Sequence, residues 1–207
     1  MITFLKPEEQ HQHPNGGGWV ANNATVAASA FVGRDAQLFG NARVSGNAKV
    51  FGNARVFGDA KVFGNALVSG DAQVFGDVQV FGNARVSGNA RVSGNALVFG
   101  DALVSGDAKV SGDARVYDYA QVSGSARVSG SAWETSPLYI QGSKHGLTNS
   151  AYGYLNIGCI KLPFSEWKKR YKEIGKEQNY TPAQIKEYGK LIALATTLGR
   201  NKTYGKA

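Results

Sequence analysis

The sequence predicts an all-β solenoid of about six coils, followed by a small α+β domain that ends in two helices. Two observations lead to the solenoid. An aliphatic residue returns at every sixth position from Val20 to Val128 without an insertion, which gives 19 consecutive hexads of the pattern V-[F/S]-G-[N/D]-A-x. A period of six is too short for a helical or propeller repeat, but it suits a β-helix in which each hexad is one short strand and one corner. A third observation predicts the second domain: the periodicity stops near Ala132, and Lys, Tyr, Ile and Leu then become frequent.

The two ends of a solenoid need covers, because unpaired strand edges invite uncontrolled stacking. Residues 1–19 are polar and glycine-rich, and we expect them to cover the first coil. Residues 20–133 form the predicted rod, and residues 134–207 form a basic α+β cap at its other end. Three hexads make one triangular coil, so strands stacked about 4.8 Å apart give a rod roughly 30 Å long.

Two positions of each hexad are steadily apolar, the aliphatic residue and the alanine four places later. We expect this pair to point into a narrow core. Gly followed by Asn or Asp lies between them, where the chain turns a corner, because these residues accept left-handed backbone more readily than others. Val78 replaces the alanine once and Tyr119 replaces Asn or Asp once, and neither change is expected to break the coil.

Residues three hexads apart stack in neighbouring coils, so the variable positions form ladders along the rod. One corner carries Phe39, Phe57 and Phe75, a second carries Phe63, Phe81, Phe99 and Tyr117, and the third carries Ser69, Ser87, Ser105 and Ser123. Stacked rings can serve simply to order a solenoid. We expect a single rod to leave the two aromatic edges largely exposed, as an apolar patch that packs in a homotrimer. A ligand-binding stripe is the alternative.

The cap shows two strand segments and two helix segments. Strands are expected at 138–141 and 154–160, joined through the polar stretch around 143–153. Ser165 is predicted to cap a helix whose apolar side carries Trp167, Tyr171 and Ile174. A capping box at 181–184, with proline at the first helical position, predicts the second helix. That helix is expected to stop near Gly199 and to bury Ile185, Tyr188, Ile192 and Ala195.

The net charge of +8 is concentrated in the cap, where residues 134–207 hold twelve Lys and Arg against five Asp and Glu. Such a domain favours an anionic partner, such as a nucleotide, a nucleic acid or an acidic protein. A solvated basic helix face around 168–172 is the alternative interpretation. The chain has no aromatic RNP motif and no zinc-finger spacing, so nucleic acid is the least favoured of these partners.

The single cysteine, Cys159, excludes an internal disulfide and suits a reducing compartment. The first six residues are too short for the apolar core of a signal peptide, and no run of about 18 apolar residues is present to span a membrane. We therefore expect a cytoplasmic protein that does not contact a membrane.

The hexad pattern of residues 20–133 resembles the left-handed β-helix family, whose best-known members are trimeric acyltransferases. The resemblance implies a left-handed parallel β-helix. Those enzymes present a histidine base near a loop that interrupts the coils, because the reaction needs a group with a pKa near 7. This rod has no such loop and no histidine, since the three histidines are His11, His13 and His145. We expect no catalytic residue, and an acyltransferase is the enzymatic alternative.

Other cofactor and metal chemistry is also not expected. The many glycines belong to corners and do not form a phosphate-binding loop before a helix. The H-Q-H segment supplies only two metal ligands, and Cys159 has no partner cysteine. The sequence therefore predicts neither a cofactor nor a metal site.

The cap motif G-S-K-H-x-x-T precedes a strand ending in I-G-C, a Trp-containing helix and a helix with E-Y-x-x-x-I-x-L-A. This succession resembles the C-terminal domain of hexapeptide-repeat proteins that are common in bacteriophages and prophages. The matching residues are Ser143, Lys144, His145, Thr148, Gly158, Cys159, Trp167, Glu187 and Tyr188. The resemblance implies that the chain is encoded by a phage or prophage.

Physically, the cap motif offers a cation, a titratable ring and a hydroxyl near the end of a strand, which suits an anion pocket. The predicted ligand-binding residues are Lys144, His145, Thr148, Cys159 and Trp167. The alternative is that Cys159 and Trp167 belong to the core and that Lys144 is an ordinary surface residue.

We therefore expect a non-catalytic, oligomeric binding protein that holds a small anionic, nucleotide-like ligand. The resemblance to phage proteins adds the hypothesis that it sequesters a nucleotide immune signal in the host cytoplasm, as an anti-defence sponge. The alternatives are an acyltransferase-like enzyme with a displaced site and a structural or protein-docking phage protein.

Overall fold

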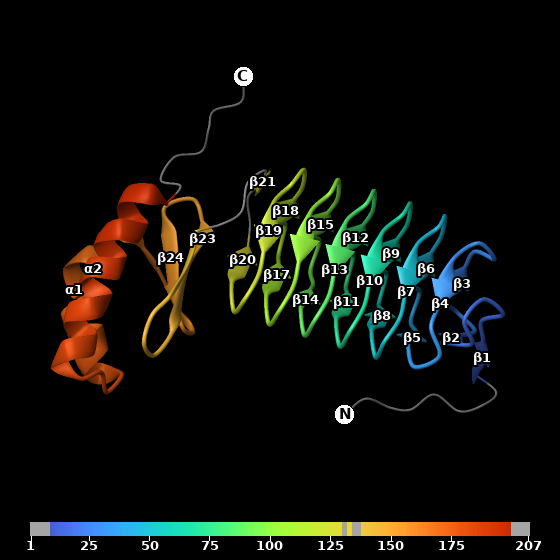
Figure 1. Cartoon of the computed structure of the whole chain (residues 1–207), viewed down its shortest axis with the longest axis horizontal. Coiled ribbons are helices and arrows are strands. Elements are labelled where there is room, and N and C mark those ends of the chain that lie inside the picture. Colours follow the sequence, from blue (N-terminus) through green and yellow to red (C-terminus); the bar gives the residue numbers. More distant parts are fainter. Residues whose placement is uncertain (1–8, 130–131, 134–137, 200–207) are drawn as a thin grey trace, which may run out of the picture.

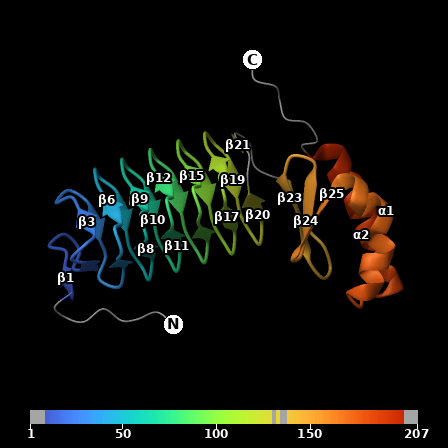
Figure 2. The ribbon, with the colours of Figure 1, turned by 180° about the vertical axis from the view of Figure 1, so that it is seen from behind.

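The computed structural model describes residues 9–129, 132–133 and 138–199. They form a rod of stacked coils with a small cap at one end (Figure 1). Seen from behind, the coils follow one another in chain order, and the cap strands and helices lie beyond the last coil (Figure 2). The prediction of a parallel β-helix of about six turns with a small C-terminal domain is confirmed.

Three sheets form the faces of the rod, which we call faces I, II and III. Face I contains β1 (Gln10–Gln12), β2 (Trp19–Ala21), β5 (Gln37–Leu38), β8 (Arg55–Phe57), β11 (Gln73–Phe75), β14 (Arg91–Val92), β17 (Lys109–Ser111) and β20 (Arg127–Ser129). Face II contains β4 (Phe31–Val32), β7 (Lys49–Val50), β10 (Leu67–Val68), β13 (Arg85–Val86), β16 (Leu103–Val104) and β19 (Gln121–Val122). Face III contains β3 (Thr25–Val26), β6 (Arg43–Val44), β9 (Lys61–Val62), β12 (Gln79–Val80), β15 (Leu97–Val98), β18 (Arg115–Val116) and β21 (Ala132–Trp133).

The coils are held in a constant register. From β2 to β20, each strand pairs in parallel with the strand one coil away, so that Val68 lies between Val50 and Val86 of the two neighbouring coils. The pairing continues on both sides of Val78 and Tyr119, as predicted. Only the last pair departs from this register, because β18 pairs Arg115 with Ala132, whereas the regular step of three hexads would give Trp133. The periodic register is therefore lost where the rod meets the cap.

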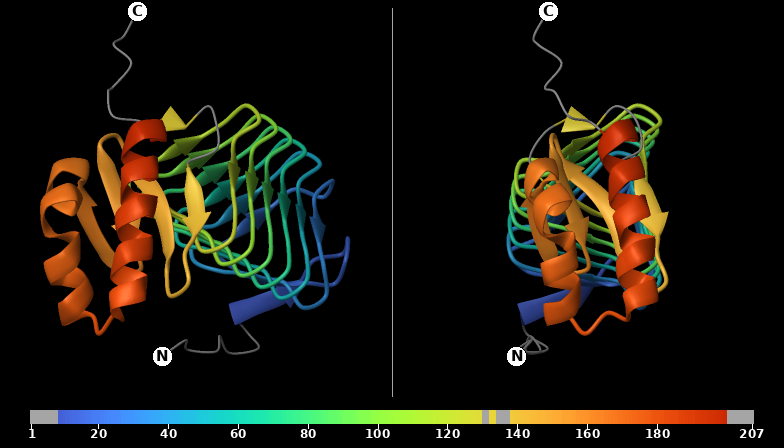
Figure 3. Two further views of the ribbon diagram at one scale, coloured as in Figure 1. Left: turned by 60° about the vertical axis from the view of Figure 1, so that its left-hand side comes forward. Right: turned by 90° about the vertical axis from the view of Figure 1, so that its left-hand side faces the viewer.

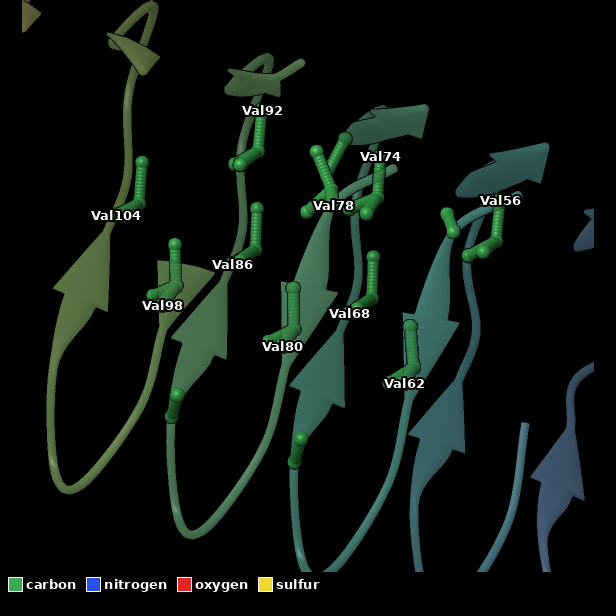
Figure 4. Close-up of a cluster of buried hydrophobic side chains, with 14 of the residues drawn as sticks. Val56, Val62, Val68, Val74, Val78, Val80, Val86, Val92, Val98 and Val104 are labelled. Carbon is green, nitrogen blue, oxygen red and sulfur yellow. The ribbon is translucent and has the colours of Figure 1, made fainter. Parts of the chain in front are cut away.

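The core of the rod consists of the predicted inward pair. From Ala30 to Val128, the aliphatic residue and the alanine of each hexad are at most 1% exposed, and Val78 is also fully buried. Figure 4 shows these valines pointing into the interior of successive coils. The narrow core leaves no room for a larger or polar side chain, because protein interiors are packed nearly as densely as crystals.

The corners depend on glycine for two reasons. At the corner glycines from Gly40 to Gly124, φ lies between +60° and +83°. A Cβ atom at Gly52 would also lie 2.9 Å from the backbone nitrogen of Gly70 in the next coil. Asp118 takes the place of glycine at one corner and adopts a φ of +53°. Aspartate tolerates this left-handed conformation better than most residues, so the coil continues.

The polar residue of each corner adds a hydrogen-bond ladder. An asparagine Nδ2 donates to the side-chain oxygen of the residue one coil further on, over distances of 2.9–3.4 Å. The pairs are Asn41–Asp59, Asn47–Asn65, Asn53–Asp71, Asn65–Asn83, Asn83–Asp101, Asn89–Asp107 and Asn95–Asp113. Asp accepts but cannot donate onward, so each of these runs of hydrogen bonds ends at an Asp.

The aromatic ladders stack face to face, with ring centroids 4.7–5.0 Å apart and rings within 7° of parallel. The expectation that a single rod leaves these edges largely exposed is wrong. All seven rings are half-buried, because each ring covers the face of its neighbour. Only ring edges are left for solvent, so inner rings of the ladders have no free face on which a ligand ring could stack.

The first coil is covered by the segment that precedes it. Strand β1 pairs antiparallel with β2, and Gly17 forms an antiparallel bridge with Gly33. The backbone nitrogen of Val32 donates to the carbonyl of Asn15. These contacts pair backbone groups at the open edge of faces I and II, as a cover must.

The cap contains one antiparallel sheet and two helices. The sheet has the order β22 (Tyr139–Gln141), β23 (Gly146–Ala151), β24 (Tyr154–Ile157) and β25 (Ile160–Pro163). Two strand predictions need correction. The polar stretch contains an inner strand, β23, whose sequence GLTNSA has few typical strand residues. It forms a strand because it pairs with β22 on one side and β24 on the other. The segment 154–160 is split by the turn at Gly158, whose φ is +59°.

Helix α1 (Phe164–Glu177) begins two residues earlier than predicted. Its N-cap is Pro163 and makes no side-chain hydrogen bond, so Ser165 lies inside the first turn and is not the cap. The predicted apolar side is confirmed, since Trp167 and Ile174 are buried and Tyr171 is half-buried.

Helix α2 (Pro182–Leu198) matches its prediction closely. Thr181 is the N-cap, and both hydrogen bonds of the capping box with Gln184 are formed. Tyr188, Ile192 and Ala195 are buried, Ile185 is half-buried, and the C-cap is Gly199. The sequence signals at both ends of this helix are local, which explains their accuracy.

The cap sheet lies between the last coil and the two helices (Figure 3). On the helix side, Leu147, Leu155 and Ile157 join the core formed with α1 and α2. Strand β23 contacts β20 on the other side. Alternation along the strands therefore turns Thr148, Ser150 and Asn156 toward the end of the rod.

Replacing Val74 by Asp tests the inward assignment. The Val74 side chain is fully buried, so the carboxylate would lie without a partner in a core too narrow to rearrange. We expect a loss of more than about 4 kcal/mol in the free energy of unfolding, measured by thermal unfolding with circular dichroism. The neighbouring change Gln73→Asp, on the outer surface, should melt close to wild type. Equal melting temperatures for Val74→Asp and wild type would contradict the assignment.

Candidate functional site

The cap is held on the rod by contacts at two places. The ring of Tyr139 packs against the rod core and lies next to Gly124. On the opposite edge of the cap sheet, the Lys161 Nζ donates a hydrogen bond of 2.8 Å to the Ser129 Oγ of β20. The sheet therefore covers the end of the rod, but with a face that carries several polar side chains.

A polar hollow of about 240 Å³ lies between the last coil and the cap sheet. The rod contributes Ser125 and Arg127, and the cap contributes Gln141, Lys144, His145, Gly146, Thr148, Asn156 and Gly158. The hollow is a composite site, because neither the rod nor the cap forms it alone.

The wall of the hollow contains buried polar groups without partners. Thr148 is 2% exposed, and its hydroxyl makes no hydrogen bond within the described part of the chain. Asn156 is 9% exposed; its Oδ1 accepts a hydrogen bond of 2.6 Å from Ser150, while its Nδ2 has no partner among the described residues. A buried polar group without a partner costs about 1–3 kcal/mol, so each of these two groups is stabilised when a further polar partner reaches it.

The charge of the hollow is positive. Arg127 is half-buried, and its guanidinium forms no ion pair or side-chain hydrogen bond in the described ranges 9–129, 132–133 and 138–199. None of the lining residues is an Asp or Glu. Arg127 can also donate two parallel hydrogen bonds to one oxyanion, which is the geometry that carboxylate and phosphate groups favour.

Lys144 lines the hollow, but its ammonium group is engaged elsewhere. The Nζ donates to the carbonyl oxygens of Gln178 and Asn179, at 2.8 and 3.1 Å, and lies 4.6 Å from the centroid of the Tyr180 ring. Gln178 is the C-cap of α1, so this cation compensates the negative end of the helix dipole. Lys144 thus stabilises the cap, and Arg127 is the freer cation of the hollow.

The backbone of the Ser143–His145 loop is clamped by α2. Glu187 accepts hydrogen bonds from the backbone nitrogen and the hydroxyl of Ser143. The hydroxyl of Tyr188 accepts from the backbone nitrogens of Lys144 and His145 and donates to the His145 carbonyl oxygen. The two halves of the cap motif, G-S-K-H and E-Y, therefore contact each other directly.

The ring of His145 lies between the polar hollow and the interior of the cap. It packs 5.9 Å from Tyr180 and close to Gly158, and its ring nitrogens make no hydrogen bond to any described residue. Burial, with Tyr188 beside it, raises the pKa of Tyr180 to about 12. The Tyr180 phenol is therefore neutral at physiological pH and can act as a hydrogen-bond donor.

Cys159 and Trp167 lie away from the hollow. Both line a small apolar void of about 30 Å³ between the cap sheet and the helices, which has room for about one water molecule. The Trp167 indole is buried and donates a hydrogen bond of 2.7 Å to the Leu155 carbonyl oxygen. The Cys159 thiol is free and exposed at the β24–β25 turn.

The structure thus brings three of the five predicted binding residues to one hollow, namely Lys144, His145 and Thr148. Sequence reasoning missed Arg127, Ser125, Gln141 and Asn156. The sequence held a signal for two of them, Ser125 and Asn156. Ser125 ends a ladder of Asn and Asp, and Asn156 alternates with buried leucine and isoleucine in a strand.

Among the described residues, no three His, Cys, Asp or Glu side chains gather in a way that could hold a metal ion. None of the described helices is long and apolar enough to cross a membrane.

The rod also resembles a known repeat. A family model described as the YdcK β-solenoid repeat matches residues 36–50, 78–92, 90–106, 108–124 and 120–135. These segments lie in and at the end of the rod and together make up about a third of the chain. A comparison with curated proteins found no match. The family model agrees with the coordinates that this is a repeat β-helix protein.

Replacing Tyr188 by Phe tests the clamp on the motif loop. The change removes one hydroxyl that serves three backbone groups, so we expect a loss of about 1–3 kcal/mol in the stability of the cap. Hydrogen exchange of the Lys144 and His145 amides should accelerate. Tyr171→Phe is the matched control, because the Tyr171 hydroxyl makes no hydrogen bond to a described residue. Equal effects of the two changes would show that the clamp does not stabilise the loop.

Proposed function

We propose that this solenoid is a non-catalytic binding protein that holds a phosphorylated anion in the hollow between the rod and the cap. The observation that carries the proposal is the buried Thr148 hydroxyl, which has no partner in the described chain and borders a positively charged hollow. Native proteins seldom leave such a group unsatisfied unless water or a ligand completes it.

The free groups around the hollow are mainly hydrogen-bond donors. They are the Arg127 guanidinium, the Thr148 hydroxyl and the Asn156 Nδ2, and the N–H of the His145 ring adds another. A phosphate presents only acceptors when fully ionised, so it can satisfy all of them at once. A cationic or apolar ligand would satisfy none.

The size of the hollow limits how much of a ligand it encloses. Its volume of about 240 Å³ lies below the roughly 300–1,000 Å³ of pockets that enclose drug-sized ligands. The hollow would therefore hold the phosphate end of a molecule, while the remainder would lie outside. A nucleotide that binds by its phosphate is one such ligand.

A narrower version of the proposal concerns the biological role. If the chain is encoded by a phage or prophage, as its cap motif implies by resemblance, the bound anion would be a nucleotide immune signal of the host. The protein would then act as an anti-defence sponge in the host cytoplasm, by binding the signal without converting it. This role needs affinity and abundance but no catalytic group.

The enzymatic alternative is an acyltransferase with its site in the cap. The single histidine of the cap is His145, and its ring has no carboxylate or carbonyl partner in the described residues to fix its tautomer. Release of free CoA from acetyl-CoA that disappears in His145→Ala would favour this alternative. A second alternative, a docking cap for an acidic protein, would use the exposed lysines of α1 instead of the hollow.

Replacing Thr148 by Val separates binding from folding. Valine keeps the shape but removes the unpartnered hydroxyl, so the ligand-free protein should be as stable as wild type or more stable, by up to about 1–3 kcal/mol. Affinity for a phosphorylated ligand should fall by about tenfold in calorimetric titration with inorganic phosphate and a nucleotide panel. Added salt should weaken binding, though less than at an exposed site.

The matched pair Arg127→Gln and Arg115→Gln tests the charge. Both arginines lie at the cap end of the rod, but only Arg127 lines the hollow. We expect Arg127→Gln to abolish measurable binding and Arg115→Gln to leave it unchanged. Binding that survives both Arg127→Gln and Thr148→Val would remove the hollow as the site.

The oligomeric part of the proposal is a homotrimer that packs through the aromatic corners. Sedimentation equilibrium at micromolar concentration should give the mass of three chains. Phe81→Ser should dissociate the trimer without unfolding the rod, because serine occupies the same hexad position at the third corner, for example at Ser87. A wild-type monomer would leave the ring stacks with the single role of ordering the coils.

A further inference from the structure

A groove along the rod ends one coil before the hollow. A groove of about 440 Å³ runs along one corner of the rod beside face I, lined by Asp71, Asn89 and Asp107 from the corner and by Gln73, Arg91 and Lys109 from the face. At the same two hexad positions of the next coil stand Ser125 and Arg127, which line the hollow. The corner ladder and the face ladder therefore continue directly from the groove into the hollow.

The charges of the groove cancel. Arg91 and Lys109 are balanced by Asp71 and Asp107, whereas Arg127 has Ser125 beside it in place of an acid. The positive charge is thus confined to the hollow. A chain of phosphates or a nucleic-acid strand would meet the carboxylates of Asp71 and Asp107 along this path. It would gain no electrostatic attraction from a groove without net charge.

The groove also offers no surface for a nucleobase. Its lining contains no aromatic ring and no aliphatic side chain, although bases bind proteins largely by stacking on such groups. It does offer alternating donors and acceptors. The Asp107 Oδ1 accepts a hydrogen bond of 2.9 Å from Asn89, and its second oxygen is free of partners in the described chain, as are the Arg91 and Lys109 cations. Neutral hydroxyl groups can use both kinds of partner.

The length of the groove sets the size of the ligand. The strands of successive coils lie about 4.8 Å apart, so the three steps from Asp71 to Ser125 span about 14 Å. This distance suits an extended body attached to the phosphate, of at least disaccharide size.

We propose that the ligand is a phosphorylated sugar chain, with its phosphate in the hollow and its hydroxyl-rich body in the groove. This inference rests on the proposed function, because it assumes that the hollow binds the phosphate. It adds a second subsite, formed by Lys109, Asp107 and Arg91, to which neither the sequence motif nor the cap contributes.

The rod provides its own control for this subsite. A second groove of about 310 Å³ has the same chemistry, with Asn41, Asp59 and Asp77 at the corner and Arg43, Lys61 and Gln79 on face III. That groove contributes no residue to the hollow. Asp59 accepts a hydrogen bond from Asn41 just as Asp107 does from Asn89. Asp107→Asn and Asp59→Asn are therefore a matched pair.

The experiment is calorimetric titration of the full chain with four probes: inorganic phosphate, glucose 6-phosphate, trehalose 6-phosphate and AMP. Wild type should bind trehalose 6-phosphate at least about tenfold more tightly than each of the other three. Asp107→Asn should reduce this advantage several-fold and leave the affinity for inorganic phosphate unchanged. Asp59→Asn should change neither value.

Each result separates the two proposals. If no probe binds, the proposed function fails, and the sugar subsite fails with it. If phosphate binds but trehalose 6-phosphate binds no more tightly, or AMP binds best, the sugar subsite is overturned while the hollow stands as an anion site. If Asp107→Asn and Asp59→Asn have equal effects, the sugar body does not lie in the groove beside face I.

Discussion

The constant length of the coils is the constraint on which the rest of this molecule depends. Because every coil contains three complete hexads, each residue lies above its equivalent in the previous coil, and the backbone of one coil pairs with the next. Alanine and valine fill the core, glycines allow the coils to approach at the corners, and asparagine and phenylalanine form ladders. An insertion of one residue would turn every following side chain to the wrong position.

The same constraint limits where function can arise. A regular coil presents the same kinds of groups at each step, so a site that differs from the rest must lie where the register ends. In this chain that place is the junction with the cap. There the register slips, so that Arg115 pairs with Ala132 instead of Trp133, the Asn and Asp ladder ends in Ser125, and a sheet with a partly polar face closes the rod.

The rod was predictable from sequence because its determinants are local. Each hexad specifies its own strand and corner, and the capping box at Thr181 specifies the start of α2 in the same way. The cap sheet and the hollow were harder to foresee. Strand β23 depends on pairing with two neighbours, Lys144 meets carbonyls 34 and 35 residues away, and Arg127 approaches Thr148 only through the packing of two domains. No local pattern encodes such contacts.

Whether the hollow binds an anion or only water depends on the competition between the two. Water can satisfy the Thr148 hydroxyl and the Asn156 amide, and a hollow of this volume has room for several molecules. Water cannot neutralise Arg127, whose charge lies half-buried without a carboxylate partner in the described chain. Two charges interact more strongly beside a protein surface than in bulk solvent, and partly buried pairs are screened less by salt. In the proposed complex, the arginine would therefore give an oxyanion an advantage that water lacks, and the two buried donors would fix its position.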